Sequence, residues 1–135
     1  MIYYLAQPKT YSIRAVANEK YLSVSFKSEL LKANKHKIGH FDKFQIIVHS
    51  DGSISFKSLA NEKYISIEDD NILIANSIEN SEKFYLITNR DFSISFKSIR
   101  NLQYLTLNNE NLQIVASKDE IKINEKFNII TNTDG

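Results

Sequence analysis

The stretch that decides the fold is residues 51–87, which read "DGSISFKSLANEKYISIEDDNILIANSIENSEKFYLI". It contains four short apolar segments, which begin at Ile54, Tyr64, Ile72 and Phe84. Apolar and polar residues alternate in these segments, and isoleucine, phenylalanine and tyrosine are frequent, which is typical of half-buried strands. The residues between them, such as "EDDN" and "SIENSE", have the chemistry of turns. The stretch therefore predicts four β-strands.

The same four segments recur on both sides of this stretch. "ANEKYLSV" begins at Ala17, "ANEKYISI" at Ala60 and "RNLQYLTL" at Arg100, which gives spacings of 43 and 40 residues. Two further segments follow in each unit. The first reads "LLKAN", "ILIAN" and "LQIVAS" in the three units, and the second reads "DKFQIIV", "EKFYLIT" and "EKFNIIT". We therefore expect a single domain over residues 1–135, built from three repeats at about 11–52, 53–92 and 93–131.

Three units of four strands predict an all-β protein of twelve strands with the β-trefoil fold, in which a six-stranded barrel is capped at one end by three hairpins. A propeller has units of this size but needs about four blades to close. An irregular sandwich is the alternative. Helix content should be close to nil, apart from a single turn near "SKDEIK" at residues 117–122.

The hexapeptide "SISFKS" at residues 53–58 and 93–98 is predicted to form the first strand of its unit, with Ile and Phe inward and Ser and Lys outward. The near-copy "SVSFKS" at residues 23–28 follows "NEKY", so it should form a second strand and the turn after it. The first-unit counterpart of "SISFKS" is instead "YSIRAV", which begins at Tyr11. The hexapeptide is therefore a strand-forming pattern and not a binding motif.

Composition excludes several kinds of site. The chain has no cysteine, so disulfides, thiolate metal sites and cysteine nucleophiles are absent. The start "MIYYLAQPK" has neither a basic leader nor an apolar run of membrane length, and Ile2 rules out N-myristoylation, so the default expectation is a cytoplasmic protein without membrane insertion. Residues 1–49 carry eight Lys or Arg and three Asp or Glu, whereas residues 50–135 carry nine and thirteen. This moderate asymmetry does not suggest a nucleic-acid partner.

The repeat pattern resembles that of the fascin-like β-trefoils, which include fascin and the hisactophilins, over about residues 11–131. The matching features in the second unit are Gly52 followed by Ser58, the step from Lys63 to Ser66, the "NILIAN" segment at residues 71–76, and the closing Phe84. The resemblance implies the β-trefoil fold and, for fascin relatives, binding to actin. The chain has three histidines, far fewer than hisactophilin, and no tryptophan, so it also lacks the Gln-x-Trp signature of ricin-type lectins.

Several residues recur at equivalent positions in all three units. We expect the recurring aromatic residues to fill the barrel and its cap, although the alternative is that they stack against sugars. These residues are Tyr21, Tyr64 and Tyr104, and Phe44, Phe84 and Phe127. Asn18, Asn61 and Asn101 each precede the tyrosine by three residues, and we expect them to form tight turns, through a positive φ and bonds to the local backbone, and not to bind a ligand.

The loops between the second and third strands of the units differ in sequence. In sugar-binding trefoils this region commonly lines the ligand pocket, and carboxylate and amide groups suit sugar hydroxyls. The candidate ligand-binding residues are Asp69, Asp70, Asn71, Asn108, Asn109 and Asn111. The alternative is that they form solvated polar hairpins. A calcium site is not expected from Asp69 and Asp70, because calcium needs six or more oxygen ligands.

One loop of the first unit concentrates positive charge. "KANKHKIGH" contains Lys32, Lys35, His36, Lys37 and His40. These side chains could receive phosphate, sulfate or an acidic protein surface, increasingly so as the histidines become protonated below about pH 6.5. The alternative is an ordinary solvated loop.

The two ends of the chain raise a question of pairing. Residues 2–5 look like an additional strand ahead of the first unit, and they could compete with residues 127–131 for the place beside the strand at residues 11–16. Two hypotheses follow: the chain derives from a tandem array of trefoils, or one terminal strand pairs with another subunit.

No catalytic constellation is visible, because the three histidines fall in one unit and the carboxylates fall in turns, where burial is not expected. No enzyme activity, cofactor or metal site is predicted. The predicted function is a non-catalytic, lectin-like module that binds a carbohydrate or similar polar ligand, with up to three pseudo-equivalent sites. The alternative is a cytoskeletal or scaffold protein that binds actin or another protein surface.

Overall fold

The computed structural model describes residues 9–79 and 82–133. Within these ranges, the chain forms twelve strands and three single turns of 3-10 helix. The strands are β1 (Thr10–Ala15), β2 (Tyr21–Val24), β3 (Leu31–Lys35), β4 (Phe44–Val48), β5 (Ile54–Ser58), β6 (Tyr64–Ile67), β7 (Leu73–Ser77), β8 (Phe84–Thr88), β9 (Ile94–Ser98), β10 (Tyr104–Leu107), β11 (Ile114–Lys118) and β12 (Phe127–Asn132). The helical turns are η1 (His40–Asp42), η2 (Asp69–Asn71) and η3 (Ile123–Glu125). The all-β prediction is confirmed; the expected helical turn lies slightly later, at η3, and η1 and η2 were not predicted.

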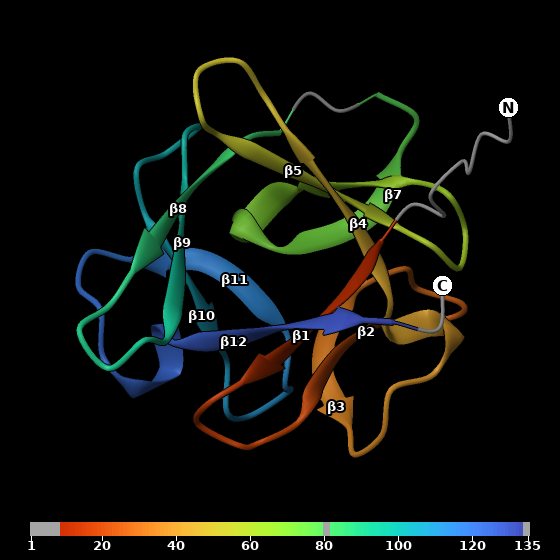
Figure 1. Cartoon of the computed structure of the whole chain (residues 1–135), viewed down its shortest axis with the longest axis horizontal. Coiled ribbons are helices and arrows are strands. Elements are labelled where there is room, and N and C mark those ends of the chain that lie inside the picture. The colour runs from red at the N-terminus through yellow and green to blue at the C-terminus, as the bar shows by residue number, and fades with distance from the viewer. Residues whose placement is uncertain (1–8, 80–81, 134–135) are drawn as a thin grey trace, which may run out of the picture.

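Six strands close into a barrel. β1 pairs with β4, β4 with β5, β5 with β8, β8 with β9, β9 with β12, and β12 again with β1, every pair being antiparallel. Figure 1 looks down this ring, with β1 and β12 crossing in front. The closed ring leaves no free edge among the six strands, which is how a chain of short strands avoids pairing with other chains.

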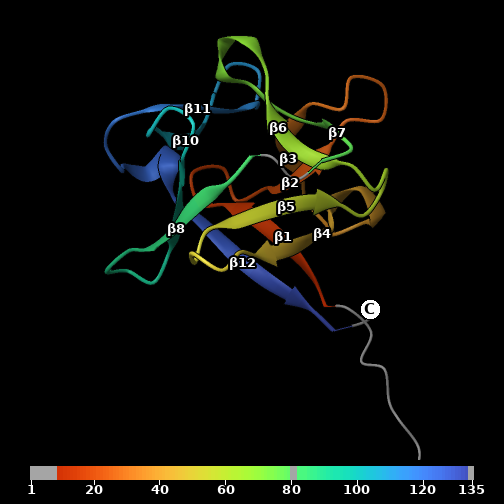
Figure 2. The same cartoon turned by 90° about the horizontal axis from the view of Figure 1, so that it is seen from above.

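The other six strands form three hairpins, β2–β3, β6–β7 and β10–β11, that cap one end of the barrel. Figure 2 shows them together on one side of the barrel strands. Isolated bridges connect the hairpins to one another at Leu30 and Ile74, and at Ile72 and Val115. Barrel and cap together are the β-trefoil that the repeats predict, with "SISFKS" at β5 and β9 and its near-copy at β2 and the following turn.

The core contains the predicted phenylalanines but not the tyrosines. Phe44, Phe84 and Phe127 are fully buried, and Phe84 lies next to Phe56 with ring centroids 5.5 Å apart. Tyr64, by contrast, is half-buried, because it pairs with Lys57 on the outer face of β5, whose ammonium lies 5.5 Å from the tyrosine ring centroid. The equivalent tyrosines of the other units are also half-buried, so the prediction of core tyrosines was wrong.

The asparagine turns are confirmed, with one correction. Asn61 donates its side-chain amide to the carbonyl oxygen of Ala75 at 2.9 Å and accepts from the backbone N–H of Lys63 at 3.0 Å. Asn18 and Asn101 make equivalent bonds. The positive φ lies on the following residue, for example 57° at Glu62, and not on the asparagine. The side-chain amide ties each turn to the third strand of its unit.

The serines of "SISFKS" were expected on the outer face of the strand, but the structure buries them. Ser55 is buried, and its hydroxyl donates to the carbonyl oxygen of Glu82 at 2.8 Å. Ser95 and Ser12 donate in the same way to the carbonyl oxygens of Glu125 and Asp42. The loop before the fourth strand of each unit therefore covers the outer face of the first strand.

The same loops bury three carboxylates, which corrects the expectation that the acids lie in exposed turns. Asp42, Glu82 and Glu125 immediately precede the Lys-Phe step of their units, and all three are buried. Each accepts hydrogen bonds from backbone or side-chain donors, as described below. The repeated acid before "KF" is thus part of the framework.

The C-terminal strand occupies the disputed place beside β1. β12 pairs with β1 over six residue pairs, from Thr10 with Asn132 to Ala15 with Phe127. The predicted strand at residues 2–5 lies outside the described residues.

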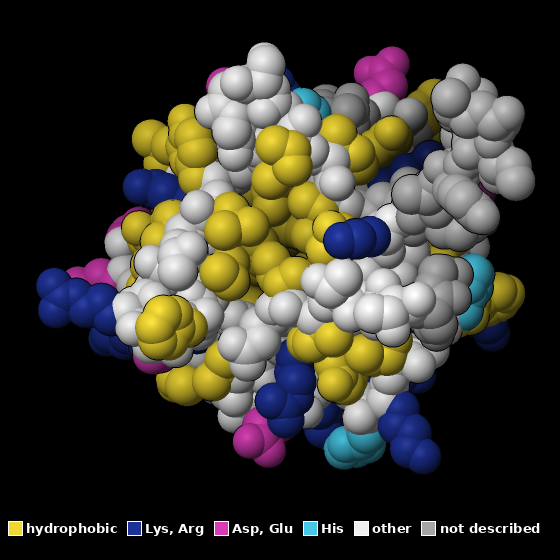
Figure 3. Space-filling view, in the orientation of Figure 1, with side chains coloured by type: hydrophobic (Ala, Val, Ile, Leu, Met, Phe, Trp, Pro, Cys, Tyr) yellow, Lys and Arg dark blue, Asp and Glu magenta, His cyan; other side chains and the backbone are white. Residues whose placement is uncertain are grey.

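Figure 3 shows apolar side chains gathered at the centre of the face that Figure 1 presents. No helix among the described residues is long and apolar enough to cross a membrane.

Candidate functional site

A pocket of about 880 Å³ lies in the third unit, between the β10–β11 hairpin and the loop that carries η3. We call it the third-unit pocket. Its lining comes from β10 and β11, from the turn between them, and from the loop before β12. The lining residues are Thr106, Leu107, Asn108, Asn109, Glu110, Val115, Ser117, Lys118, Asp119, Glu120, Lys122, Ile123, Asn124 and Glu125.

The base of the pocket is held by Glu125, whose residue surface is only 3% exposed. One carboxylate oxygen accepts from the backbone N–H of Lys122 at 2.7 Å, and the other accepts from the hydroxyl of Thr106 at 2.6 Å. The side-chain amide of Asn124 donates to the carbonyl oxygen of Leu107 at 3.0 Å. Because these bonds join the η3 loop to β10, the two walls of the pocket are fixed relative to each other.

The rim of the pocket is polar and more exposed. Asn108 accepts from the backbone N–H of Glu110 at 2.9 Å, which shapes the β10–β11 turn. Asp119 accepts from the side-chain amide of Gln103 at 3.1 Å. Glu120 and Lys122 form a long, exposed ion pair at 3.9 Å, and such pairs contribute little to stability. The rim therefore offers carboxylate, amide and ammonium groups to a ligand, while Ile123, which is half-exposed, offers an apolar surface.

The first unit carries two phenylalanines at the corresponding positions. Phe26 and Asn109 each lie two residues after the end of β2 or β10, and Phe41 and Asn124 each precede a buried acid. The rings of Phe26 and Phe41 pack edge to face, with centroids 6.1 Å apart. The aromatic pair thus spans, in the first unit, the place that is hollow in the third.

The second unit uses its buried acid to bind a neighbouring unit. Glu82 forms an ion pair with Arg100 and also accepts from its Nε at 3.1 Å, while the backbone N–H of Ile67 donates to the same carboxylate at 3.3 Å. Arg100 is the residue before the turn asparagine of the third unit, a position that alanine occupies in the other two units. This contact joins the second and third units and is structural.

The structure brings together only some of the candidate ligand-binding residues. Asn108 and Asn109 line the third-unit pocket, whereas Asn111 accepts from the backbone N–H of Gln113 at 3.0 Å and does not line it. Asp69, Asp70 and Asn71 form η2 on a separate hairpin, and the φ angles of Asp70 and Asn71 are positive. Asp69 and Asp70 are exposed there.

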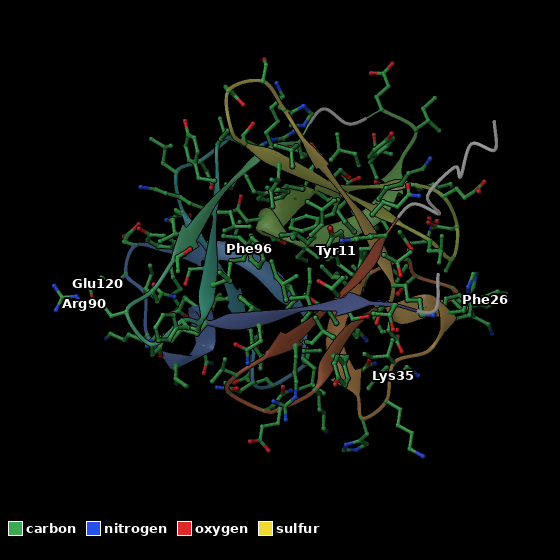
Figure 4. The ribbon with its side chains drawn as sticks, in the orientation of Figure 1. Tyr11, Phe26, Lys35, Arg90, Phe96 and Glu120 are labelled. Carbon is green, nitrogen blue, oxygen red and sulfur yellow. The ribbon has the colours of Figure 1, made fainter. Side chains whose placement is uncertain are left out.

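The basic loop of the first unit lies beside the aromatic pair. Lys32 and Lys35 belong to β3, and Lys35, His36, Lys37 and His40 are exposed. The ring of His40 lies edge to face with that of Phe41, at 6.0 Å between centroids. Figure 4 shows Phe26 and Lys35 directed away from the body of the molecule, on the side formed by β2, β3 and η1.

Sequence reasoning missed most of the pocket and both phenylalanines. The missed pocket residues include Thr106, Glu110, Asp119, Asn124 and Glu125. One signal was available, because an acid stands before "KF" in all three units. Among the described residues, no group of three or more His, Cys, Asp or Glu side chains could hold a metal ion.

No protein-family model matches the sequence, and no curated protein matches it. Solved structures do match in shape. The designed three-fold symmetric protein ThreeFoil has a TM-score of 0.79 at 14% identity, over 90% of this chain and 97% of that one. A ricin B-like lectin from Macrolepiota procera, in complex with lactose, has a TM-score of 0.78 at 12% identity, over 94% and 98%. The chain is a β-trefoil.

A third match shows the fold as part of a longer protein. The endo-β-galactosidase from Clostridium perfringens that releases GlcNAcα1-4Gal has a TM-score of 0.82 at 11% identity, over 93% of this chain. The chain spans 33% of the length of that enzyme. At these identities the likeness shows the fold alone, and residue roles do not carry over.

Proposed function

We propose that this β-trefoil is a non-catalytic carbohydrate-binding module whose ligand occupies the third-unit pocket. The observation that supports the proposal is the pocket itself, which has the size of small-molecule sites and a polar rim on a hydrogen-bonded base. The shape match with a lectin in complex with lactose agrees with it. The fascin-like relationship and actin binding are a second proposal, for which the charged first unit would be the surface.

The rim groups suit the hydroxyls of a sugar. A carboxylate such as Asp119 or Glu110 accepts from hydroxyl groups, and the amide of Asn109 can both donate and accept. Ile123 gives an apolar surface for the C–H face of a pyranose ring. Thr106 and Glu125 already form a hydrogen bond with each other, so we expect them to support the pocket and not to contact the sugar directly.

The geometry changes the expected stoichiometry. Three equivalent sites would require a hollow in each unit, but Phe26 and Phe41 span the corresponding place in the first unit. The second unit presents the exposed acids of η2 on its hairpin instead. We therefore expect one principal sugar site for each chain, and binding that does not weaken with added salt, because hydrogen bonds to neutral hydroxyls are insensitive to ionic screening.

The test is a glycan array followed by calorimetric titration of lactose and of the strongest neutral glycan on the array. Asn109→Ala together with Asp119→Ala should weaken binding about a hundredfold, since each lost hydrogen bond to a sugar costs about a factor of ten. The matched control is Asp69→Ala with Asp70→Ala, which removes polar groups from the equivalent hairpin of the second unit. Equal losses in both double variants, or no neutral glycan bound at all, would contradict the proposal.

A further inference from the structure

The surface formed by Phe26, Phe41 and the lysines around them has no part in the third-unit pocket. We call it the aromatic–basic surface. Phe26 is 80% exposed and Phe41 is 39% exposed, although phenylalanine is normally buried. Exposed aromatic residues that gather in this way usually mark a contact site, because their solvation is unfavourable until a partner covers them.

Basic residues flank the two phenylalanines in the sequence of the first unit. Lys27 follows Phe26 in the same turn and is exposed, as are Lys35 and Lys37 beyond the end of the hairpin. His36 and His40 are exposed on the same segment. The surface therefore combines apolar ring faces with cationic side chains on flexible stems.

Negative charge is almost absent from the same segment. Between Phe26 and Phe41 the sequence contains one acidic residue, Glu29. Its carboxylate accepts from the side-chain amide of Asn61 at 3.1 Å and from Lys63 at 3.4 Å. Asp42, the next acid along the chain, is buried and accepts from the backbone N–H of Gly39 at 2.7 Å. The positive charges are therefore left for an external anion.

We propose that the aromatic–basic surface binds an anionic polysaccharide, one that bears sulfate groups along its chain. The ring faces of Phe26 and Phe41 would contact the C–H faces of the sugars, and the ammonium groups of Lys27, Lys35 and Lys37 would bind the anionic substituents. The lysines are point charges on flexible stems, which suits anionic groups spaced irregularly along a polymer.

The shape of the surface favours a polymer over a small ligand. Phe26 projects from a turn and is 80% exposed, so a long chain can lie across its ring, whereas so exposed a ring does not enclose a monosaccharide. The place also corresponds, through the pseudo-symmetry, to that of the third-unit pocket. The inference does not depend on the proposed function, because the two sites share no residue.

The test is calorimetric titration with a heparin-derived octasaccharide and with the same octasaccharide after desulfation. The wild-type chain should bind the sulfated form, with affinity that falls as salt is added. Phe26→Ala should weaken binding about tenfold, as the loss of an aromatic contact commonly does. The matched control is Phe92→Ala, because Phe92 is 86% exposed in a turn of another unit. That control should leave the affinity unchanged.

A second pair of variants tests the charges. Lys35→Gln with Lys37→Gln should weaken binding of the sulfated octasaccharide about tenfold and reduce its dependence on salt. Lys9→Gln with Arg90→Gln removes the same charge from exposed positions elsewhere and should have much less effect. The pocket variant Asn109→Ala with Asp119→Ala should bind the octasaccharide normally, which separates this inference from the proposed function.

Three further probes test whether the surface prefers another class of anionic partner. Oligo(dT), poly-glutamate and vesicles containing phosphatidylserine carry negative charge in other chemical forms. If any of them binds more tightly than the sulfated octasaccharide, the surface serves that class of partner and the proposal is wrong. Equal binding of the sulfated and desulfated sugars, or equal losses in the Phe26 and Phe92 variants, would also overturn it.

Discussion

The first and third units place different chemistry on the same backbone. In both, a hairpin turn faces a short helical turn, and a buried acid in that helical turn accepts from the backbone N–H three residues before it. The third unit has Asn109 and Asn124 at the two facing positions and forms a pocket. The first has Phe26 and Phe41 there and forms a projecting aromatic pair. One pair of positions thus decides whether the site is concave and polar or convex and aromatic.

The comparison also shows what the units cannot vary. The phenylalanine that opens the fourth strand is buried in each unit, and the turn asparagine donates to an alanine carbonyl in each. The acid before "KF" is also buried in each unit, although the partners of Glu82 differ from those of the other two. These residues define the framework. Loop residues carry no such constraint, so a change there alters binding without altering the fold.

The largest effect should come from the shared framework. Phe84→Ala removes a fully buried ring that contacts Phe56, and we expect a loss of about 3–5 kcal/mol in the free energy of unfolding. Phe44→Ala and Phe127→Ala should cost about as much, because the units are equivalent. Urea denaturation gives the values. A loss below about 1 kcal/mol at any of these positions would contradict the shared core, and the exposed control Phe92→Ala should change stability by less than about 0.5 kcal/mol.

The fold could be predicted because the framework is periodic. Strand alternation and the recurring Asn-x-x-Tyr and "KF" steps predict twelve strands and the three-fold arrangement. Periodicity did not show which residues of a strand are covered from outside. Ser55 alternates with the core residues and so was expected in water, but the loop that carries Glu82 covers it. Tyr64 is a large aromatic residue at a strand position and was therefore expected in the core. Its partner on the neighbouring strand is Lys57, and it is only half-buried.

The next largest effect should distinguish the buried acids. Glu125→Ala leaves the hydroxyl of Thr106 and the N–H of Lys122 without an acceptor, so we expect a loss of about 2–3 kcal/mol and a much weaker third-unit pocket. Asp42→Ala leaves the N–H of Gly39 without its acceptor, and should cost about 1 kcal/mol with no effect on that pocket. Equal losses of sugar binding in the two variants would show that Glu125 does not act locally.

The site was harder to predict than the fold. Asn108 and Asn109 were found because polar residues in a hairpin turn are visible in sequence, but Thr106, Asp119 and Glu125 approach each other only through the loop before β12. Phe26 was overlooked because it lies inside the near-copy "SVSFKS", which was interpreted only as a second strand with the turn after it. Whether the phenylalanine of this pattern is buried depends on its place within the unit: Phe56 is buried in the first strand β5, while Phe26 lies in the turn after the second strand β2.

A smaller effect on stability, but a decisive one on binding, should follow from exchanging the facing residues. Asn109→Phe with Asn124→Phe should place two rings in the third-unit pocket and abolish binding of neutral sugar. The cost in stability should be about 1 kcal/mol, because the bond from Asn124 to the Leu107 carbonyl is lost. The reverse exchange, Phe26→Asn with Phe41→Asn, should abolish binding of the sulfated octasaccharide and spare the neutral sugar. If either exchange affects both ligands alike, the two sites are not independent.

The smallest effect concerns two equivalent turns, the one that joins β4 to β5 and the one that joins β8 to β9. Hydrogen bonds from Ser93 and from Lys126 hold the pKa of Asp91 well below its ordinary value of 3.8, whereas the lowered pKa of Asp51 depends mainly on Ser53. Because the folded-state pKa is depressed, the stabilisation by Asp91 is fully present above about pH 4 and is lost as the pH falls further. The difference in urea midpoint between the wild type and Asp91→Asn should therefore be constant from neutral pH to about pH 4 and shrink below it. Asp51→Asn should show the same trend with a smaller difference. The carboxylate of Asp91 contacts the ammonium of Lys126 at 2.9 Å in addition to Ser93, whereas the lowered pKa of Asp51 depends mainly on hydrogen bonds from Ser53. A difference that grows toward acid would contradict the assignment.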